Sequence, residues 1–147
     1  MSTVKSFWYP GYEGHRDRLG IAAATSIPST ARLVTISGQL AMDPANRDKP
    51  IPTGHAAQFD LAMQNVEKAL AAASPHLSRE ELWDGVYTVT SYHVGPLQQE
   101  DRTECFEITK KWFSIGKQNP CWTAIGVLEL FVPGLLVEVQ VQAAYAQ

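Results

Sequence analysis

Glu138 has the setting that most clearly predicts chemistry, because it is a lone carboxylate within the apolar run of residues 135–141. A carboxylate in such a strand could act as a general acid or base, or could hold a water molecule for reaction. It could equally be a solvated strand residue in a polar row with Gln140 and Gln142. The residues alone leave both interpretations open.

Trp122 lies in a second strand-like run, at residues 119–128. Its indole offers a flat apolar surface and one N–H donor, but no charge. It could form the wall of a ligand cleft, or it could be a core or subunit-interface tryptophan. Ser37, in Ile36-Ser37-Gly38-Gln39, lacks the Gly-x-Ser-x-Gly elbow of a nucleophile. We therefore expect Ser37 to bind a ligand or water, or simply to end a strand.

The cysteines and histidines show no pattern that predicts a nucleophile or a metal site. Neither Cys105 nor Cys121 has a neighbouring base or cation motif, which favours inert, buried thiols. The four histidines are scattered without metal-ligand spacing, so we expect no metal. His93 lies in a predicted strand and is a candidate proton-transfer partner for Glu138. No phosphate loop or dinucleotide fingerprint is present, and we expect no cofactor.

Two predicted helices and several predicted strands must position these residues. Apolar residues recur at helical spacing over residues 55–73, before Ser74-Pro75, and again over about residues 98–115. Ser78 and Glu81 match a capping box for a further short turn. Strands are predicted at residues 20–24, 32–37 and 86–94, and on each side of Pro133-Gly134. Residues 1–19 are expected to form an irregular arm or an edge strand.

This order of elements predicts an α+β fold with both helices on one face of a mixed sheet. In the last strand, Val137, Val139 and Val141 alternate with polar residues, so the valines should face the helices. The polar row should face solvent or a neighbouring subunit. A sheet with one helix-free face favours oligomerisation.

Size and composition favour a single globular domain spanning residues 1–147. The chain is 45% hydrophobic and 18% charged, with a formal net charge of -3 and no long basic run, which argues against nucleic-acid binding. No apolar stretch approaches the roughly 20 residues of a membrane span. The N-terminal residues lack the apolar core of a signal peptide, and we expect a cytoplasmic protein with reduced thiols.

Several segments, taken in order, resemble the RidA/YjgF family, formerly called the endoribonuclease L-PSP family. They are Ser37-Gly38-Gln39-Leu40-Ala41-Met42-Asp43-Pro44, Gln64-Asn65-Val66, residues 86–94, and the strands that contain Pro120 and Glu138. The resemblance extends from about Gly20 to Tyr145. It implies a chorismate mutase-like fold and a homotrimer with three clefts between subunits. It also implies hydrolysis of reactive enamines and imines.

The resemblance also assigns roles to residues. In the family's deaminases, an arginine two residues after a proline like Pro120 pairs with the substrate carboxylate, and this chain has Trp122 there. The family glutamate that holds or activates water falls on Glu138, and the family serine falls on Ser37. The remaining substrate-binding positions that the resemblance implies are Ile21, Ser91, Tyr92, His93, Phe106, Cys121 and Thr123. The implied cleft is apolar and aromatic.

Three functions follow from this pattern as hypotheses. The first is a RidA-like enzyme that uses Glu138 for water activation or proton transfer on a small uncharged or aromatic substrate, by enamine or imine hydrolysis or by tautomerisation. General 2-iminoacid deaminase activity should then be weak or absent. The second is a metabolite-binding trimer that kept the fold and lost the chemistry. The third is a ribonuclease, which the acidic charge balance disfavours.

Overall fold

The computed structural model describes residues 2–147, which form six strands and four helices. Four of the strands make up the main sheet, and the other two form a separate small sheet. In chain order, the elements are β1 (Lys5–Phe7), α1 (Glu13–Leu19), β2 (Ala24–Ser26), β3 (Arg32–Leu40), α2 (His55–Ala73), α3 (Arg79–Asp84), β4 (Val86–Val94), α4 (Gln99–Phe113), β5 (Cys121–Val127) and β6 (Val137–Tyr145).

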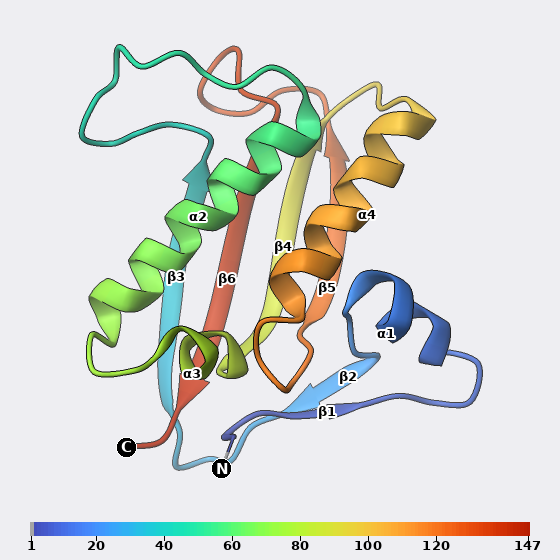
Figure 1. Cartoon of the computed structure of the whole chain (residues 1–147), viewed down its shortest axis with the longest axis vertical. Helices are drawn as coiled ribbons and strands as arrows, with labels where there is room; N and C mark the ends of the chain where they lie inside the picture. Colours follow the sequence, from blue (N-terminus) through green and yellow to red (C-terminus); the bar gives the residue numbers. More distant parts are fainter. Residues whose placement is uncertain (1) are drawn as a thin grey trace.

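The main sheet has the strand order β3-β6-β4-β5. Its pairings are antiparallel except for β4 with β5, which are parallel and joined through α4. Helices α2 and α4 lie side by side across one face of this sheet (Figure 1). This arrangement confirms the prediction of an α+β fold with a mixed sheet and two helices on one face.

The core lies between α2 and the central strands. Phe59, Met63 and Val66 of α2 are fully buried, as the helical spacing of its apolar residues predicted. Val137 and Val139 of β6 are also fully buried, whereas Gln140 is exposed and Glu138 and Gln142 are half-buried. The predicted alternation of β6 is confirmed, and it turns the polar row of this strand to the helix-free face.

The N-terminal region differs from the prediction. Residues 20–24 do not form a strand of the main sheet. Instead α1 ends at Leu19 and is capped by Gly20, which has a left-handed φ of 73°. The short β2 follows and pairs with β1 in a separate two-stranded sheet. Ile21 and Ala22 are buried beside the core without a strand partner in either sheet. Their apolar run therefore reflects burial of a connecting segment and not a strand.

Strand β3 is longer than predicted because a bulge carries it past Gly38. Ile36 pairs with Val141 and Gln39 pairs with Val139, so Ser37 and Gly38 together stand opposite the single residue Gln140. Such a bulge bends a strand and changes where its side chains point.

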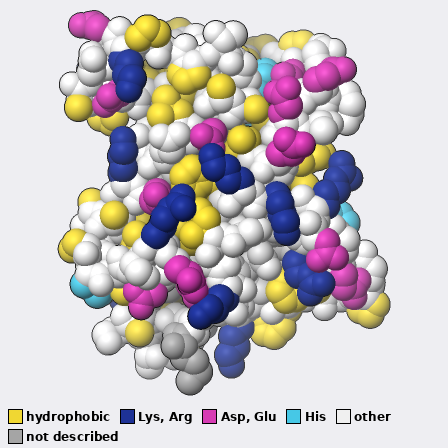
Figure 2. Space-filling view, in the orientation of Figure 1, with side chains coloured by type: hydrophobic (Ala, Val, Ile, Leu, Met, Phe, Trp, Pro, Cys, Tyr) yellow, Lys and Arg dark blue, Asp and Glu magenta, His cyan; other side chains and the backbone are white. Residues whose placement is uncertain are grey.

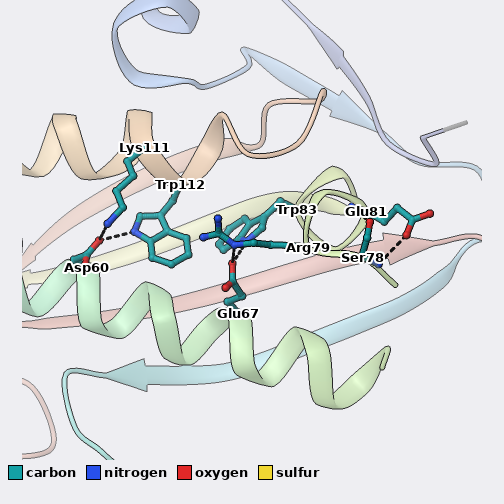
Figure 3. A network of polar contacts seen from close by, with 8 residues as sticks. All are labelled: Asp60, Glu67, Ser78, Arg79, Glu81, Trp83, Lys111 and Trp112. Carbon is teal, nitrogen blue, oxygen red and sulfur yellow. Dashed lines mark hydrogen bonds and ion pairs between the residues drawn. The ribbon is translucent and has the colours of Figure 1, made fainter. Parts of the chain in front are cut away.

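Two carboxylates of α2 form hydrogen bonds and ion pairs with the neighbouring helices α4 and α3 (Figure 3). Asp60 accepts hydrogen bonds from the Trp112 indole at 2.8 Å and from Lys111 at 2.7 Å, both from α4. Burial alone would raise the pKa of Asp60, but these hydrogen bonds outweigh it and the pKa lies below its ordinary value.

The second carboxylate, Glu67, lies two helical turns further along α2. It accepts hydrogen bonds at 2.7 Å from both the Trp83 indole and the Arg79 side chain of α3 (Figure 3). Ser78 and Glu81 form the predicted capping box at the start of α3. The helical layer is thus held to one geometry above the sheet.

Candidate functional site

Trp122, in β5, begins a chain of hydrogen bonds on the helix-bearing face of the sheet. Its indole N–H donates to the Ser91 hydroxyl at 2.8 Å, and that hydroxyl lies 2.7 Å from Nε2 of His93. An indole N–H can only donate, so the Ser91 proton is free to be donated to Nε2.

His93 is neutral over most of the pH range. Burial, with a smaller contribution from nearby His55, lowers its pKa to about 4. Its side chain is 4% exposed, and within residues 2–147 Nδ1 has no hydrogen-bond partner. An unpartnered, buried polar nitrogen is unusual in a folded protein.

Next to this chain of hydrogen bonds lies a cavity of about 320 Å³ between β5 and α4. Trp122 forms one wall and meets Phe106 and Phe113 edge-on, with ring centroids 6.3 and 6.2 Å apart. The lining is largely apolar and comprises His93, Leu97, Arg102, Cys105, Phe106, Trp122, Ala124, Ile125 and Gly126. A cavity of this size and character suits a small apolar or aromatic molecule.

Cys105 lines the cavity but is a poor nucleophile. Burial, with smaller contributions from Asp101 and Glu104, raises the pKa of its thiol to about 12. The thiolate is the reactive form of cysteine, so this thiol is inert at neutral pH. The burial predicted for Cys105 is confirmed, whereas Cys121 is only half-buried, contrary to the prediction that both thiols are buried.

Glu138 lies on the opposite face of the sheet from Trp122. On β4, Val89 is in register with Trp122, whereas Tyr92 is in register with Glu138. Residues in register share a face, and residues three apart on one strand point to opposite faces. The sheet therefore separates the Glu138 carboxylate from the cavity of the same chain.

The Glu138 side chain lies over the bulge of β3. A Cβ built on Gly38 would fall 2.8 Å from the Glu138 carboxyl carbon and 3.1 Å from its Cγ, so only a glycine leaves the carboxylate this space. Glu138, Gly38, Tyr92 and Gln140 line a hollow of about 330 Å³ together with the segment that follows β5. Ser37 follows the buried Ile36 and is exposed on this same face.

The remaining predicted site residues are dispersed. Ile21 is a core residue, 4% exposed, whose carbonyl accepts a hydrogen bond from the Trp8 indole. Cys121 is half-buried, with its sulfur 3.7 Å from the Thr25 hydroxyl, and Thr123 is exposed in register with Thr90. The structure therefore brings together Trp122, Ser91, His93 and Phe106 on one face, and Glu138, Tyr92 and Ser37 on the other.

Sequence reasoning missed Arg102 and Leu97 as members of the cavity lining. Arg102 precedes Phe106 by one helical turn, so the two residues share a face of α4, and this spacing could have revealed it. Leu97 lies in the connection before α4, where no periodic pattern exists to place it.

On the helix-bearing face seen in Figure 2, Lys and Arg side chains are interspersed with Asp and Glu side chains. This mixed surface lacks the concentration of positive charge typical of a nucleic-acid interface. Among residues 2–147, no helix is both long and apolar enough to cross a membrane. Within the same residues, no group of three or more His, Cys, Asp or Glu side chains could hold a metal ion.

Comparison with protein families gives a match to the model described as Endoribonuclease L-PSP, over residues 23–145. No curated protein matches the chain.

Solved structures share the fold over nearly the whole chain. A Rid-family protein of unknown function from Yersinia pestis, YyfB, is 19% identical with a TM-score of 0.76, covering 97% of this chain and 99% of its own. The protein YJGH is 25% identical with a TM-score of 0.61, covering 99% and 98%. Escherichia coli TdcF with bound serine is 19% identical with a TM-score of 0.62, covering 97% and 100%.

Proposed function

Because the chain belongs to the endoribonuclease L-PSP family, which includes the YjgF and RidA proteins, we propose that it is a homotrimeric enzyme acting on a small enamine or imine. The observation that carries this proposal is the apolar cavity walled by Trp122 and bordered by His93. Members of this family are typically homo-oligomers that bind small ligands.

The proposed catalytic site combines two copies of the chain. Glu138 and the cavity lie on opposite faces of one sheet, so one small molecule can touch both only if a second copy supplies Glu138. Strand β5 is an edge of the sheet, which leaves its outer side available for a neighbouring copy. Leu128 and Phe131, in the segment after β5, are 91% and 101% exposed and are suited to burial in such an interface.

In the proposed reaction, the Glu138 carboxylate takes a proton from a water molecule as the water oxygen bonds to the imine carbon. The nitrogen receives that proton from Glu138 and a second proton from the new hydroxyl group, and it leaves as ammonia as the carbon–nitrogen bond breaks and the carbonyl product forms. The net change is imine plus water to carbonyl plus ammonia. An aromatic cavity favours substrates with an aromatic or bulky apolar side chain over small ones.

The test measures ammonia release from imines generated in place by an amino-acid oxidase. We expect the imine of phenylalanine to be hydrolysed faster than 2-iminobutyrate, for which the rate should be weak or absent. Glu138→Gln should lower the rate with the phenylalanine imine by about 100-fold or more, since proton transfer by a positioned group contributes roughly 10²–10⁴-fold. Trp122→Ala should abolish the preference for the aromatic substrate.

Gly38→Ala tests the role of the Glu138 carboxylate without changing Glu138 itself. The new methyl group would occupy the space of the Glu138 carboxyl group, which can move aside, so activity should fall while the protein stays folded. Gly14→Ala is the matched control, since a Cβ there meets nothing within 4 Å. A 2-iminobutyrate rate like that of ordinary family deaminases would contradict the proposal. Ligand binding without turnover in the wild-type protein would identify a binding protein instead.

A further inference from the structure

Gly126 lies inside β5 at a position where the fold of residues 2–147 does not require a glycine. It does not have a positive φ, and it pairs with His93 in the regular register of β4 and β5. A Cβ built on Gly126 would meet nothing within 4 Å. An interior glycine weakens a strand, because it loses more conformational freedom on folding and has no side chain to pack. The packing of this chain therefore gives no reason for the open space above Gly126.

That open space belongs to the apolar cavity beside Trp122, which Ala124 and Gly126 also line. Alternate residues of a strand point to the same face, so Trp122, Ala124 and Gly126 share the helix-bearing face of β5. The side chains along this row shorten from an indole to a methyl group to a hydrogen atom. The β5 side of the cavity therefore has a wall at Trp122 and is open toward Gly126.

Helix α4 and the connection before it form the opposite side of the cavity. Phe106 of α4 meets Trp122 edge-on, with ring centroids 6.3 Å apart. Leu97 lies at the Gly126 end, because the connection leaves the end of β4 that is in register with the end of β5. Trp122 and Gly126 are four residues apart, which corresponds to roughly 13 Å of strand. An elongated apolar body can therefore lie along β5 between them.

We propose that Gly126 is a specificity-determining residue, which keeps the cavity long enough for an aromatic ring with a three-carbon chain to lie along β5 against Trp122. This inference rests on the cavity of the proposed function and narrows its substrate class from aromatic or bulky apolar side chains to elongated aromatic ones. Any side chain at position 126 would extend into the cavity and shorten it. In an apolar pocket, one methylene group changes the discrimination between substrates by roughly 10–200-fold.

The experiment compares cinnamate with benzoate by calorimetric titration of the full chain. Both probes have a phenyl ring and a carboxylate, but cinnamate is longer by two carbons and has the carbon skeleton of the phenylalanine imine. We expect the wild-type protein to bind cinnamate more tightly than benzoate. Gly126→Ala should reduce this preference. Gly126→Val should remove it, by weakening cinnamate about tenfold or more while changing benzoate by less than about twofold.

The same variant has a second readout that a merely structural role would not predict. Gly126→Val should raise the urea midpoint of unfolding, because valine suits a strand better than glycine and meets no clash at this position. The variant should therefore be more stable and bind the longer probe less well. Gly126→Ala adds only a methyl group and should show both effects to a smaller extent.

Ala24→Val is the matched control, because it enlarges an exposed side chain of β2 outside the cavity, and it should leave both affinities unchanged. A cinnamate preference that survives Gly126→Val, or an equal loss of both probes, would overturn the role of Gly126. Light scattering of Gly126→Val provides a further check. If the variant lost the assembly state of the wild-type protein, a neighbouring copy would occupy the space, and the inference would also be wrong.

Ammonia release distinguishes a failure of this inference from a failure of the proposed function. If Gly126→Val removed the cinnamate preference but the wild-type protein did not hydrolyse the phenylalanine imine, the proposed function would fall and Gly126 would still determine ligand length. If neither probe bound to the wild-type protein, this inference would fall, whereas hydrolysis of the imine would preserve the proposed function.

Discussion

At the scale of single residues, the Ser91 hydroxyl connects Trp122 and His93, which no sequence motif links. It accepts from the Trp122 indole and lies within hydrogen-bond distance of His93 Nε2, which fixes both rings beside the cavity. Phe59 packs edge-on against the imidazole, with centroids 5.4 Å apart. His93 is therefore held as a neutral side chain on the opposite face of the sheet from Glu138 of the same chain.

The burial of His93 predicts a specific dependence of stability on pH. Its pKa is lowered from 6.5 to about 4 on folding, so between these values the unfolded chain binds a proton that the folded chain does not. This contribution is fully present above pH 6.5 and is lost as the pH falls toward 4. In urea unfolding, the free energy of unfolding should fall as the pH is lowered from 6.5 to 4, and His93 should account for about 3 kcal/mol of this fall.

His93→Asn should flatten this part of the pH profile, even though the variant is less stable at neutral pH. His76→Gln is the control, because His76 is exposed. The relevant quantity is the difference between the free energies of unfolding at pH 7 and pH 4.5. A His93→Asn profile as steep as the wild-type profile would show that His93 is already accessible to protons in the folded state.

At the scale of elements, the two indole–carboxylate contacts of α2 determine where α3 and α4 lie (Figure 3). Trp83 is 2% exposed, and its N–H has Glu67 as its acceptor. Glu67→Ala would leave that buried donor unpaired and would also remove the ion pair with Arg79. We expect a loss of about 1–3 kcal/mol in the free energy of unfolding, measured in urea.

Glu107→Ala is the control for this prediction, since Glu107 is exposed on α4 and its removal leaves no buried donor without a partner. A loss in Glu67→Ala no larger than in Glu107→Ala would mean that solvent replaces the carboxylate at the Trp83 N–H. The indole contact would then have no structural role.

The elements that repeat a strong pattern could be predicted from the sequence. Helix α2 has its predicted bounds because apolar residues recur at Phe59, Met63 and Val66 and because Ser74-Pro75 follows. The alternation of apolar and polar residues in β6 likewise predicted that Glu138 lies on the helix-free face. Helix α1 was missed, because it has 7 residues, of which only Leu19 is buried, and so carries almost no periodic signal.

At the scale of the whole molecule, the candidate site depended on information that single segments do not contain. That Trp122 and Glu138 face opposite sides follows from the register of β4 with β5 and β6. Arg102 reaches the cavity only because the parallel β4–β5 pairing brings α4 back over the sheet edge. The sequence shows which side chains are suited to a site. Which face of the sheet each of them occupies follows only from the tertiary fold.

The helix-free face and the apolar segment after β5 are the surfaces on which an assembly would form. Leu33 on β3 is 59% exposed and Ile125 on β5 is 39% exposed, in addition to the fully exposed Phe131. Burial of such side chains contributes roughly 25 cal/mol for each Å² of apolar surface, which favours association. In the proposed trimer, this association also completes each catalytic site.

A crystal structure of the assembled protein with a bound small aromatic ligand, such as cinnamate, would test the proposed two-copy site most directly. We expect the ligand to lie against Trp122 of one copy and the Glu138 carboxylate of a second copy to face the same molecule. An assembly in which no copy brings Glu138 to the ligand beside Trp122 would contradict the proposed two-copy site.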